Sequence, residues 1–396
     1  MFRVITIKNS QLAFVIFALT VASTASAFDE PIIKEVLIIG TKEASLKLPG
    51  SGIQIGADEL KRQSYSDLNQ VVSAVPGVYV REEDGFGLRP NIGIRGASSD
   101  RSQKITLMED GVLIAPAPYS APAAYYITNA SRLYALEVLK GPSAIKSGPH
   151  TVGGAINLVT RPVPVEDLGE IDVTVGSDGY QKVAGTAGYV RSNLGFLVEG
   201  LKYGSDGFKN LDGGGDTGFT RNDVNIKIRW QPKTVVQQTL KLKLGFADED
   251  ANETYLGISD ADFEITPDRR YPASQLDRFQ SRHKQVHASY AVTLSEGLEL
   301  GAKIYHNEFD RSWNKFDGFI DGPKVQDVLR DPDDYLSAYG ILLGTRDSEV
   351  GDFSDLTIDV TDNNREFSSH GAQVDLKYPL SFTEIDHNFE FGIRYH

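Results

Sequence analysis

The feature that most constrains the fold is a strict alternation of apolar and polar residues in the chain after Pro164. From residue 224 to residue 230, for example, four apolar residues alternate with Asn225, Lys227 and Arg229. The same pattern recurs at residues 240–246, 286–294, 374–378 and 389–395. Because successive side chains of a strand point to opposite faces, this pattern predicts a sheet with one apolar and one charged face. A soluble β-sandwich alternates in the same way, so alternation alone does not decide the solvent.

The lengths of the connections decide between these two folds. Four connections are short, at residues 191–194, 231–236, 295–297 and 380–384, and three are long and polar, at residues 203–222, 247–282 and 307–365. Short turns at one end and long loops at the other are typical of an outer-membrane β-barrel. The pattern predicts nine strands, which are too few for a barrel that encloses a separate domain, since that takes about 22. We therefore expect residues 164–396 to be the N-terminal, incomplete part of a transmembrane β-barrel.

The first 27 residues have the pattern of a secretory signal peptide. Arg3 and Lys8 supply positive charge, residues 12–21 are apolar, and the small residues 25–27 offer a cleavage site. The apolar run is shorter than the roughly 20 residues that a membrane-spanning helix needs. The alternative is a buried N-terminal helix.

Residues 51–163 are rich in glycine and proline and are expected to form a small α+β domain, preceded by a linker at residues 28–50. A helix is predicted at residues 66–74, capped by Ser66 and ended by Pro76 and Gly77. Strands are predicted at residues 78–82, 91–95, 105–109, 112–114, 136–140 and 155–160. Asp110 and Gly111 between two apolar runs predict a two-residue hairpin turn.

Composition excludes several functions. The formal net charge of −14 argues against nucleic acid as a partner, and the absence of cysteine excludes thiolate metal sites and cysteine nucleophiles. No Ser/His/Asp arrangement indicates catalysis, so we predict that the protein is not an enzyme. Asp248, Asp250 and Asn252 begin like a calcium loop, but Glu253 occupies the position that requires glycine. A weak calcium site there is a minor alternative.

Five segments between residues 87 and 160 resemble the plug of TonB-dependent outer-membrane receptors, above all the ferric-citrate branch. The segments are NIGIRG at 91–96, LMEDGV at 107–112, APAPYS at 115–120, LEVLKGP at 136–142 and GGAINLVT at 153–160. They occur in the order found in that family. The following strands and loops are similar more weakly, and the similarity reaches residue 396.

The resemblance implies a mainly β fold, in which an α+β plug fills a barrel of about 22 strands in the outer membrane of a Gram-negative bacterium. It also implies import of a ferric chelate, most readily ferric citrate, with energy passed from the inner-membrane complex by TonB. Ferric iron would be the cargo, and the protein itself would hold neither a resident cofactor nor a metal site. The stretch of about 25 residues before the plug is too short for the periplasmic signalling domain that the best-known ferric-citrate receptor carries.

A TonB box is expected between the signal peptide and the plug. The fitting segment consists of Glu35, Val36, Leu37, Ile38, Ile39, Gly40 and Thr41. Its β-branched residues suit strand addition, in which the exposed backbone pairs with the edge of a partner sheet. The alternative is an ordinary first strand of the plug.

Arginines are the expected contacts for an anionic ferric chelate, because a guanidinium donates two parallel hydrogen bonds to a carboxylate. The candidates are Arg89, Arg269, Arg270, Arg278, Arg282 and Arg311, with Tyr119, Ser120 and Gln275 as neutral donors. For each arginine the alternative is a loop ion pair with a nearby acid such as Asp260, Asp262, Asp268 or Asp277.

Three rival functions remain. The same architecture could carry another siderophore, a vitamin or a sugar. Outside this class, the rival is a passive porin or an adhesive barrel, which would need neither plug nor TonB box. The third is a secreted β-sandwich enzyme, which would be soluble in the periplasm.

Overall fold

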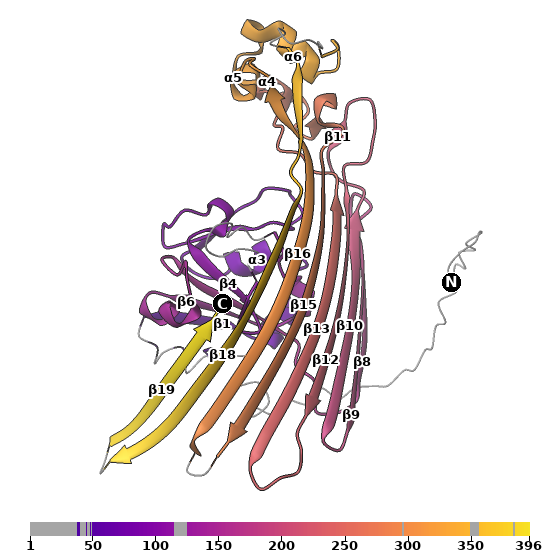
Figure 1. Ribbon diagram of the computed structural model, residues 1–396. Coiled ribbons are helices and arrows are strands. Elements are labelled where there is room, and N and C mark those ends of the chain that lie inside the picture. The colour runs from indigo at the N-terminus through magenta and orange to yellow at the C-terminus, as the bar shows by residue number, and fades with distance from the viewer. Residues whose placement is uncertain are drawn as a thin grey trace, which may run out of the picture.

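The computed structural model describes residues 38–39, 45, 48, 50–114, 125–294, 297–348, 356–382 and 385–396. It contains a small mixed domain that lies against one face of a long, curved antiparallel sheet (Figure 1). The predicted signal peptide and most of the predicted TonB box lie outside the described residues. Among the described residues, no helix combines the length and the apolar character needed to cross a membrane.

The small domain, here called the plug, is built on a five-stranded sheet with the order β1-β6-β7-β4-β5. Its strands are β1 (Ser51–Ile55), β4 (Ile105–Glu109), β5 (Val112–Leu113), β6 (Leu133–Lys140) and β7 (Gly154–Thr160). A separate hairpin pairs β2 (Val78–Arg81) with β3 (Asn91–Ile94). The helices are α2 (Ala57–Gln63) and α3 (Leu68–Ser73), and the short 3-10 turns are η2 (Asp100–Ser102), η3 (Ala130–Arg132) and η4 (Pro142–Ser147). The six predicted strands are confirmed, whereas β1 and α2 were not predicted.

Two local predictions for the plug have different outcomes. Asp110 and Gly111 form the predicted hairpin turn, both with positive φ, between β4 and β5. The predicted cap of the helix is wrong by one residue, because Asp67 and not Ser66 accepts the free backbone N–H of Asn69, at 2.7 Å. Serine and aspartate are comparable N-caps, but the extended backbone of Asp67 makes it the residue that directly precedes the helix at Leu68.

The large sheet contains ten strands: nine follow the order β19-β18-β16-β15-β13-β12-β10-β9-β8, and the tenth, β17, pairs with β16. Their bounds are β8 (Leu168–Val175), β9 (Gln181–Arg191), β10 (Leu194–Ser205), β12 (Phe219–Trp230), β13 (Gln237–Ala251), β15 (Arg278–Thr293), β16 (Glu299–Phe319), β17 (Ile358–Asp362), β18 (Arg365–Phe382) and β19 (Ile385–Tyr395). All of these pairings are antiparallel. The nine predicted strands are therefore confirmed.

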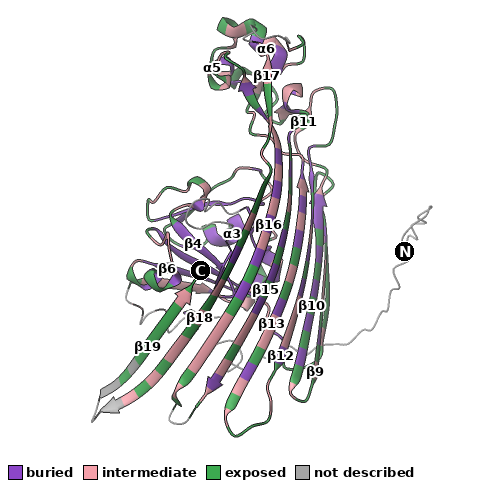
Figure 2. Ribbon diagram, in the orientation of Figure 1, coloured by how far each residue is buried: buried purple, intermediate pink, exposed green. Residues whose placement is uncertain are grey.

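The two faces of this sheet differ as the alternation predicts. On β12 and β13, Asp223, Asn225 and Lys243 are buried against the plug, whereas Val224 is 45% exposed and Leu240 41% exposed on the opposite face. Figure 2 shows the resulting alternation of buried and exposed residues along strands such as β10. The polar face is thus turned inward and the apolar face outward, the reverse of a soluble sheet. We call the sheet the wall.

The strands reach further toward the long loops than predicted. β13 continues to Ala251, and β15 already begins at Arg278, inside the segment 247–282 that was expected to be a loop. The ladder continues because backbone hydrogen bonds do not require the apolar pattern that ends there. At the far end (Figure 1) lie β11 (Asn210–Leu211), α4 (Asp260–Ile265), β14 (Arg269–Arg270), η5 (Pro272–Ser274), α5 (Val325–Arg330), η7 (Pro332–Tyr335) and α6 (Leu336–Leu342).

Candidate functional site

The register of the wall aligns inward-facing side chains into rungs that cross several strands. One rung near the long loops runs from Arg221 on β12 through Glu249, Ser281 and Arg311 to Arg365 on β18. Because every second residue of a strand faces the plug, one inward residue on each strand is enough to build the whole row. The row faces the plug loops that precede β4 and β6.

Arg311 lies at the centre of an arginine–aromatic cluster formed by Arg101, Arg311, Tyr125, Tyr255 and Trp313. Its side chain is buried, and its Cζ lies 4.4 Å from the centre of the Tyr125 ring and 5.6 Å from that of Trp313. Within the described part of the chain, its Nε and Nη1 have no hydrogen-bond partner. Buried donors of a charged group that lack a partner are costly, so this guanidinium is placed to receive an anionic group.

Arg101 adds a second cation to the cluster. Its guanidinium donates to the hydroxyl of Tyr125 at 3.2 Å and to the hydroxyl of Tyr255 at 2.9 Å. It lies close enough to Arg311 to act on the charge of that residue, as do Arg89 and Arg365. The cluster thus joins plug, wall and loop residues around concentrated positive charge.

Arg89, a predicted contact, is buried but already neutralised. It forms ion pairs with Glu249 on β13 and with Glu253, and its Cζ lies 4.2 Å from the centre of the Phe279 ring. Its backbone N–H donates to Asp84 at 2.9 Å. These contacts tie the plug to the wall beside the arginine–aromatic cluster.

The loop arginines are not gathered with Arg311. Arg269 pairs with Asp212, whose carboxylate oxygen lies 2.6 Å from the nearest guanidinium nitrogen, and with Asp262, where the same separation is 2.8 Å. Although partial burial opposes ionisation, hydrogen bonds from two tyrosines and the charge of Arg269 hold the pKa of Asp262 below its usual range. Arg269 therefore forms loop ion pairs with acidic residues, which was the alternative to contact with the cargo.

The other predicted contacts lie outside the arginine–aromatic cluster, although Arg278 and Arg282 line one open cavity together with Arg311. Arg270 is buried and donates to the backbone carbonyls of its own loop and to Ser274. Arg278 and Arg282 are exposed on the outer face of β15, where Arg278 pairs with Asp250, and Gln275 is exposed in the loop. Tyr119 and Ser120 lie outside the described residues.

Sequence reasoning missed four of the five members of the cluster, since only Arg311 was predicted. One local pattern in the sequence could have revealed Trp313. Phe309, Arg311 and Trp313 continue the period-two pattern of β16 past its apolar part and so share the inward face. No comparable local signal connects Arg101, Tyr125 and Tyr255, which lie in three separate loops.

Below the cluster, a buried ionic network joins the hairpin of β4 and β5 to the wall. Lys243 forms ion pairs with Glu109 and, at 2.6 Å, with Asp110, and Lys227 lies 3.2 Å from Asp110. Burial opposes ionisation of Glu109, but Lys243 and Arg132 hold its pKa well below the usual range. Among the described residues no group of three His, Asp or Glu side chains is arranged to hold a metal ion.

The two described residues of the predicted TonB box are docked on the plug. The backbone N–H of Ile38 and that of Ile39 each donate at 2.8 Å to the buried carboxylate of Glu137 on β6. Asn157 on β7 donates to the same carboxylate at 2.9 Å. The side chain of Ile39 is buried in an apolar cluster that includes Leu139. We call this contact the Glu137 clamp.

Comparison with known proteins identifies the domain. Residues 45–155 match the TonB-dependent Receptor Plug Domain. The ferric enterobactin receptor of Pseudomonas aeruginosa is 22% identical over 320 residues, which cover 71% of this chain and 41% of that protein. The vitamin B12 transporter BtuB of Photobacterium profundum is 25% identical over 209 residues, covering 52% of this chain and 32% of that protein.

Solved structures share the fold. The unliganded ferric citrate transporter FecA has a TM-score of 0.67 at 20% identity, covering 90% of this chain and 48% of that one. The siderophore receptor PiuA from Acinetobacter baumannii has a TM-score of 0.64 at 16% identity, covering 93% and 47%. This chain thus spans less than half the length of each of these four proteins. Residues 45–155 thus match the plug-domain family, and the chain shares its fold with these two solved structures.

Proposed function

We propose that this chain forms the plug and part of the barrel of a TonB-dependent outer-membrane transporter that imports a ferric chelate. The observation that carries the proposal is the arginine–aromatic cluster, in which the buried guanidinium of Arg311 has two donors without a partner in the described part of the chain. An anionic chelate held between plug and loops would satisfy these donors.

The outer face of the wall supports a location in the outer membrane. Large apolar side chains are exposed there on successive strands, including Phe196, Val224, Leu240, Val286 and Ile304. A continuous apolar surface of this kind is costly in water and is covered by lipid in transmembrane barrels. The polar inward face then surrounds the plug.

Ferric citrate is the cargo that we propose first. Its carboxylates suit the guanidinium groups of Arg101 and Arg311, and a chelator that already holds the iron requires no metal ligand from the protein. The second candidate is a ferric siderophore with aromatic chelating groups. It is favoured by the rings of Tyr125, Tyr255 and Trp313, which offer stacking surfaces around the same charge.

We propose that residues 35–41 are the TonB box. Strand addition to TonB uses free backbone N–H groups, and those of Ile38 and Ile39 are engaged by Glu137. Release of the Glu137 clamp would therefore have to precede pairing with the partner.

The test is uptake of radiolabelled ferric citrate, and separately of a ferric catecholate, by cells that express the complete reading frame. Uptake of one chelate should be abolished by deletion of residues 35–41, while binding of that chelate at the cell surface persists. Uptake that survives the deletion would support a passive porin instead. Binding of neither chelate by correctly inserted protein would exclude both cargoes.

Replacement of Arg311 by alanine tests the site itself. Loss of one hydrogen bond to a charged group costs about 1.5–3 kcal/mol, so the affinity for the transported chelate should fall roughly 10- to 150-fold. Arg330→Ala is the matched control, because Arg330 is exposed on α5 and pairs with Asp327 and Asp331. Equal affinity of the two variants would show that Arg311 does not contact the cargo.

A further inference from the structure

The side chain of Asn157 on β7 links the Glu137 clamp to the hairpin of β4 and β5. Its amide nitrogen donates to the carboxylate of Glu137 at 2.9 Å, and its amide oxygen accepts the backbone N–H of Gly111, also at 2.9 Å. Asn157 is fully buried, and the register places it directly opposite Glu137 on β6. One side chain therefore bonds both to the group that holds residues 38 and 39 and to the turn of the hairpin.

An amide suits this position because it carries a donor on one arm and an acceptor on the other. A carboxylate would supply only acceptors and would place a second negative charge beside Glu137, whereas an aliphatic side chain would supply neither donor nor acceptor. Both hydrogen bonds of Asn157 are shielded from water, and in such surroundings neighbouring hydrogen bonds polarise and strengthen one another. The clamp and the turn are therefore parts of one hydrogen-bonded unit.

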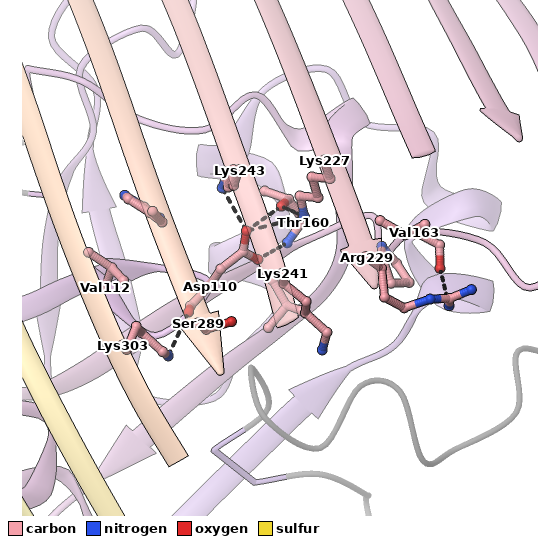
Figure 3. Close-up of a pocket in the computed structure, with 13 residues that line it drawn as sticks. Asp110, Val112, Thr160, Val163, Lys227, Arg229, Lys241, Lys243, Ser289 and Lys303 are labelled. Carbon is pink, nitrogen blue, oxygen red and sulfur yellow. Dashed lines mark hydrogen bonds and ion pairs between the residues drawn. The ribbon is translucent and has the colours of Figure 1, made fainter. Parts of the chain in front are cut away.

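The wall holds the other residue of the turn, Asp110. Its carboxylate accepts from Lys243 on β13 at 2.6 Å and lies 3.2 Å from the ammonium group of Lys227 on β12. Lys303 on β16 donates to the backbone carbonyl of Asp110 at 3.3 Å. From within the plug, Thr160 donates to the same carboxylate through its backbone N–H at 2.8 Å and its hydroxyl at 2.7 Å. Figure 3 shows these groups around Asp110.

The wall lysines neutralise two buried carboxylates of the hairpin, because Lys243 forms ion pairs with Glu109 as well as with Asp110. We call the ion pairs of Lys227 and Lys243 with these two acids the lysine lock. Removal of one partner from a buried ion pair leaves an uncompensated charge, which is strongly destabilising. If Lys243 lost its charge, the hairpin would shift until its carboxylates reached water, and the turn would leave its place beside β7.

We propose that Asn157 is a positioning residue that makes the docking of residues 38 and 39 depend on the lysine lock. While the lock is closed, the turn holds the amide of Asn157, and the amide holds the carboxylate of Glu137 toward the two backbone N–H groups that it accepts. When the lock opens, the amide loses its fixed orientation and the clamp weakens. The inference rests on the proposed function only in taking residues 35–41 for the TonB box, whose release would then report the state of the contact between plug and wall.

The experiment is a double-mutant cycle of Lys243→Gln and Asn157→Leu in the complete receptor, followed by hydrogen exchange and mass spectrometry. Groups in one hydrogen-bond network couple strongly enough to change an equilibrium roughly 2- to 150-fold. We expect Lys243→Gln to speed exchange of the peptide that contains Ile38 and Ile39 by at least about fivefold, but by less than about twofold in the Asn157→Leu background. Lys227→Gln, which leaves Lys243 in place, should give a smaller rise that Asn157→Leu also suppresses.

Lys182→Gln is the matched control. Lys182 on β9 is a buried lysine of the wall that pairs with Asp172 and donates to Ser66 of the plug, outside the lysine lock. Its replacement should leave exchange at residues 38 and 39 unchanged. If Lys243→Gln unfolds the plug as a whole, every plug peptide exchanges faster, and the milder Lys227→Gln then decides the proposal.

Two results would overturn the proposal. One is unchanged exchange at residues 38 and 39 in both lysine variants, and the other is a double variant whose rate equals the product of the two single effects within about twofold. Binding of the purified periplasmic domain of TonB to the same variants separates this inference from the proposed function. Coupled exchange without any TonB binding would support the role of Asn157 and contradict the TonB box, whereas TonB binding with uncoupled exchange would do the reverse.

Discussion

The Glu137 clamp leads to a prediction whose size can be worked from the structure. Glu137 is fully buried, and its two carboxylate oxygens accept the N–H groups of Ile38 and Ile39 and the side-chain amide of Asn157. Glu137→Gln keeps the shape but replaces one acceptor oxygen with an NH₂ donor. At least one of these N–H groups then faces a donor in place of an acceptor.

The expected loss follows from the charge of the acceptor. A hydrogen bond to a charged group contributes about 1.5–3 kcal/mol, and each 1.4 kcal/mol changes an equilibrium about tenfold. Loss of one such bond should therefore increase the population of the released segment roughly 10- to 150-fold. The buried side chain of Ile39 still holds the segment, so release remains partial.

Hydrogen exchange measured by mass spectrometry on the complete receptor tests this prediction. The peptide that contains Ile38 and Ile39 should exchange faster by that factor in Glu137→Gln, while peptides from the rest of the plug keep their rates. Glu82→Gln is the control, because Glu82 is exposed on the same domain. Unchanged exchange at residues 38–39 would refute the clamp, and faster exchange across the whole plug would show that Glu137 only maintains the fold.

Two further predictions concern the stability of the plug. Burial raises the pKa of Asp67 to about 6 from 3.8, and the folded plug therefore binds this proton more tightly than the unfolded chain does. The free energy of unfolding should therefore fall as the pH rises from about 4 to about 6. In urea unfolding at a series of pH values, Asp67→Asn should remove this dependence on pH. The same pH dependence in the variant and in the unaltered protein would contradict the assignment. Ile156→Ala removes a fully buried side chain from the centre of β7 and should cost about 2–5 kcal/mol of unfolding free energy, whereas Val152→Ala, at a residue 85% exposed, should cost almost nothing. Similar losses at the two positions would be incompatible with the packing of the plug core.

The parts of the fold that were predicted correctly depend on short-range rules. The hairpin at Asp110 and Gly111 follows from two adjacent residues that tolerate positive φ. The wall strands follow from a two-residue period that any segment reveals by itself. The helix cap was placed one residue away because Ser66 and Asp67 both suit the position, and only the backbone geometry selects between them.

The residues of the candidate site could not be predicted from such short-range rules in the same way. Six arginines were proposed with equal reason, yet only Arg311 lies in the cluster with aromatic rings and partnerless donors. Arg269 satisfies its charge with Asp212 and Asp262, and one of these acids lies 57 positions away in the chain. Whether an arginine is paired or available depends on such distant partners.

The sequence by itself determined the β architecture, the two faces of the wall and the division into short turns and long loops, because each of these follows from the periodicity and the local chemistry of the chain. Only the tertiary structure decided which charges meet. The rung of Arg221, Glu249, Ser281 and Arg311 arises when strand register aligns residues from β12 to β16, and the arginine–aromatic cluster arises when plug, loop and wall pack together. Register and packing are collective properties, since a shift of one residue in a single strand would turn every inward cation on it outward.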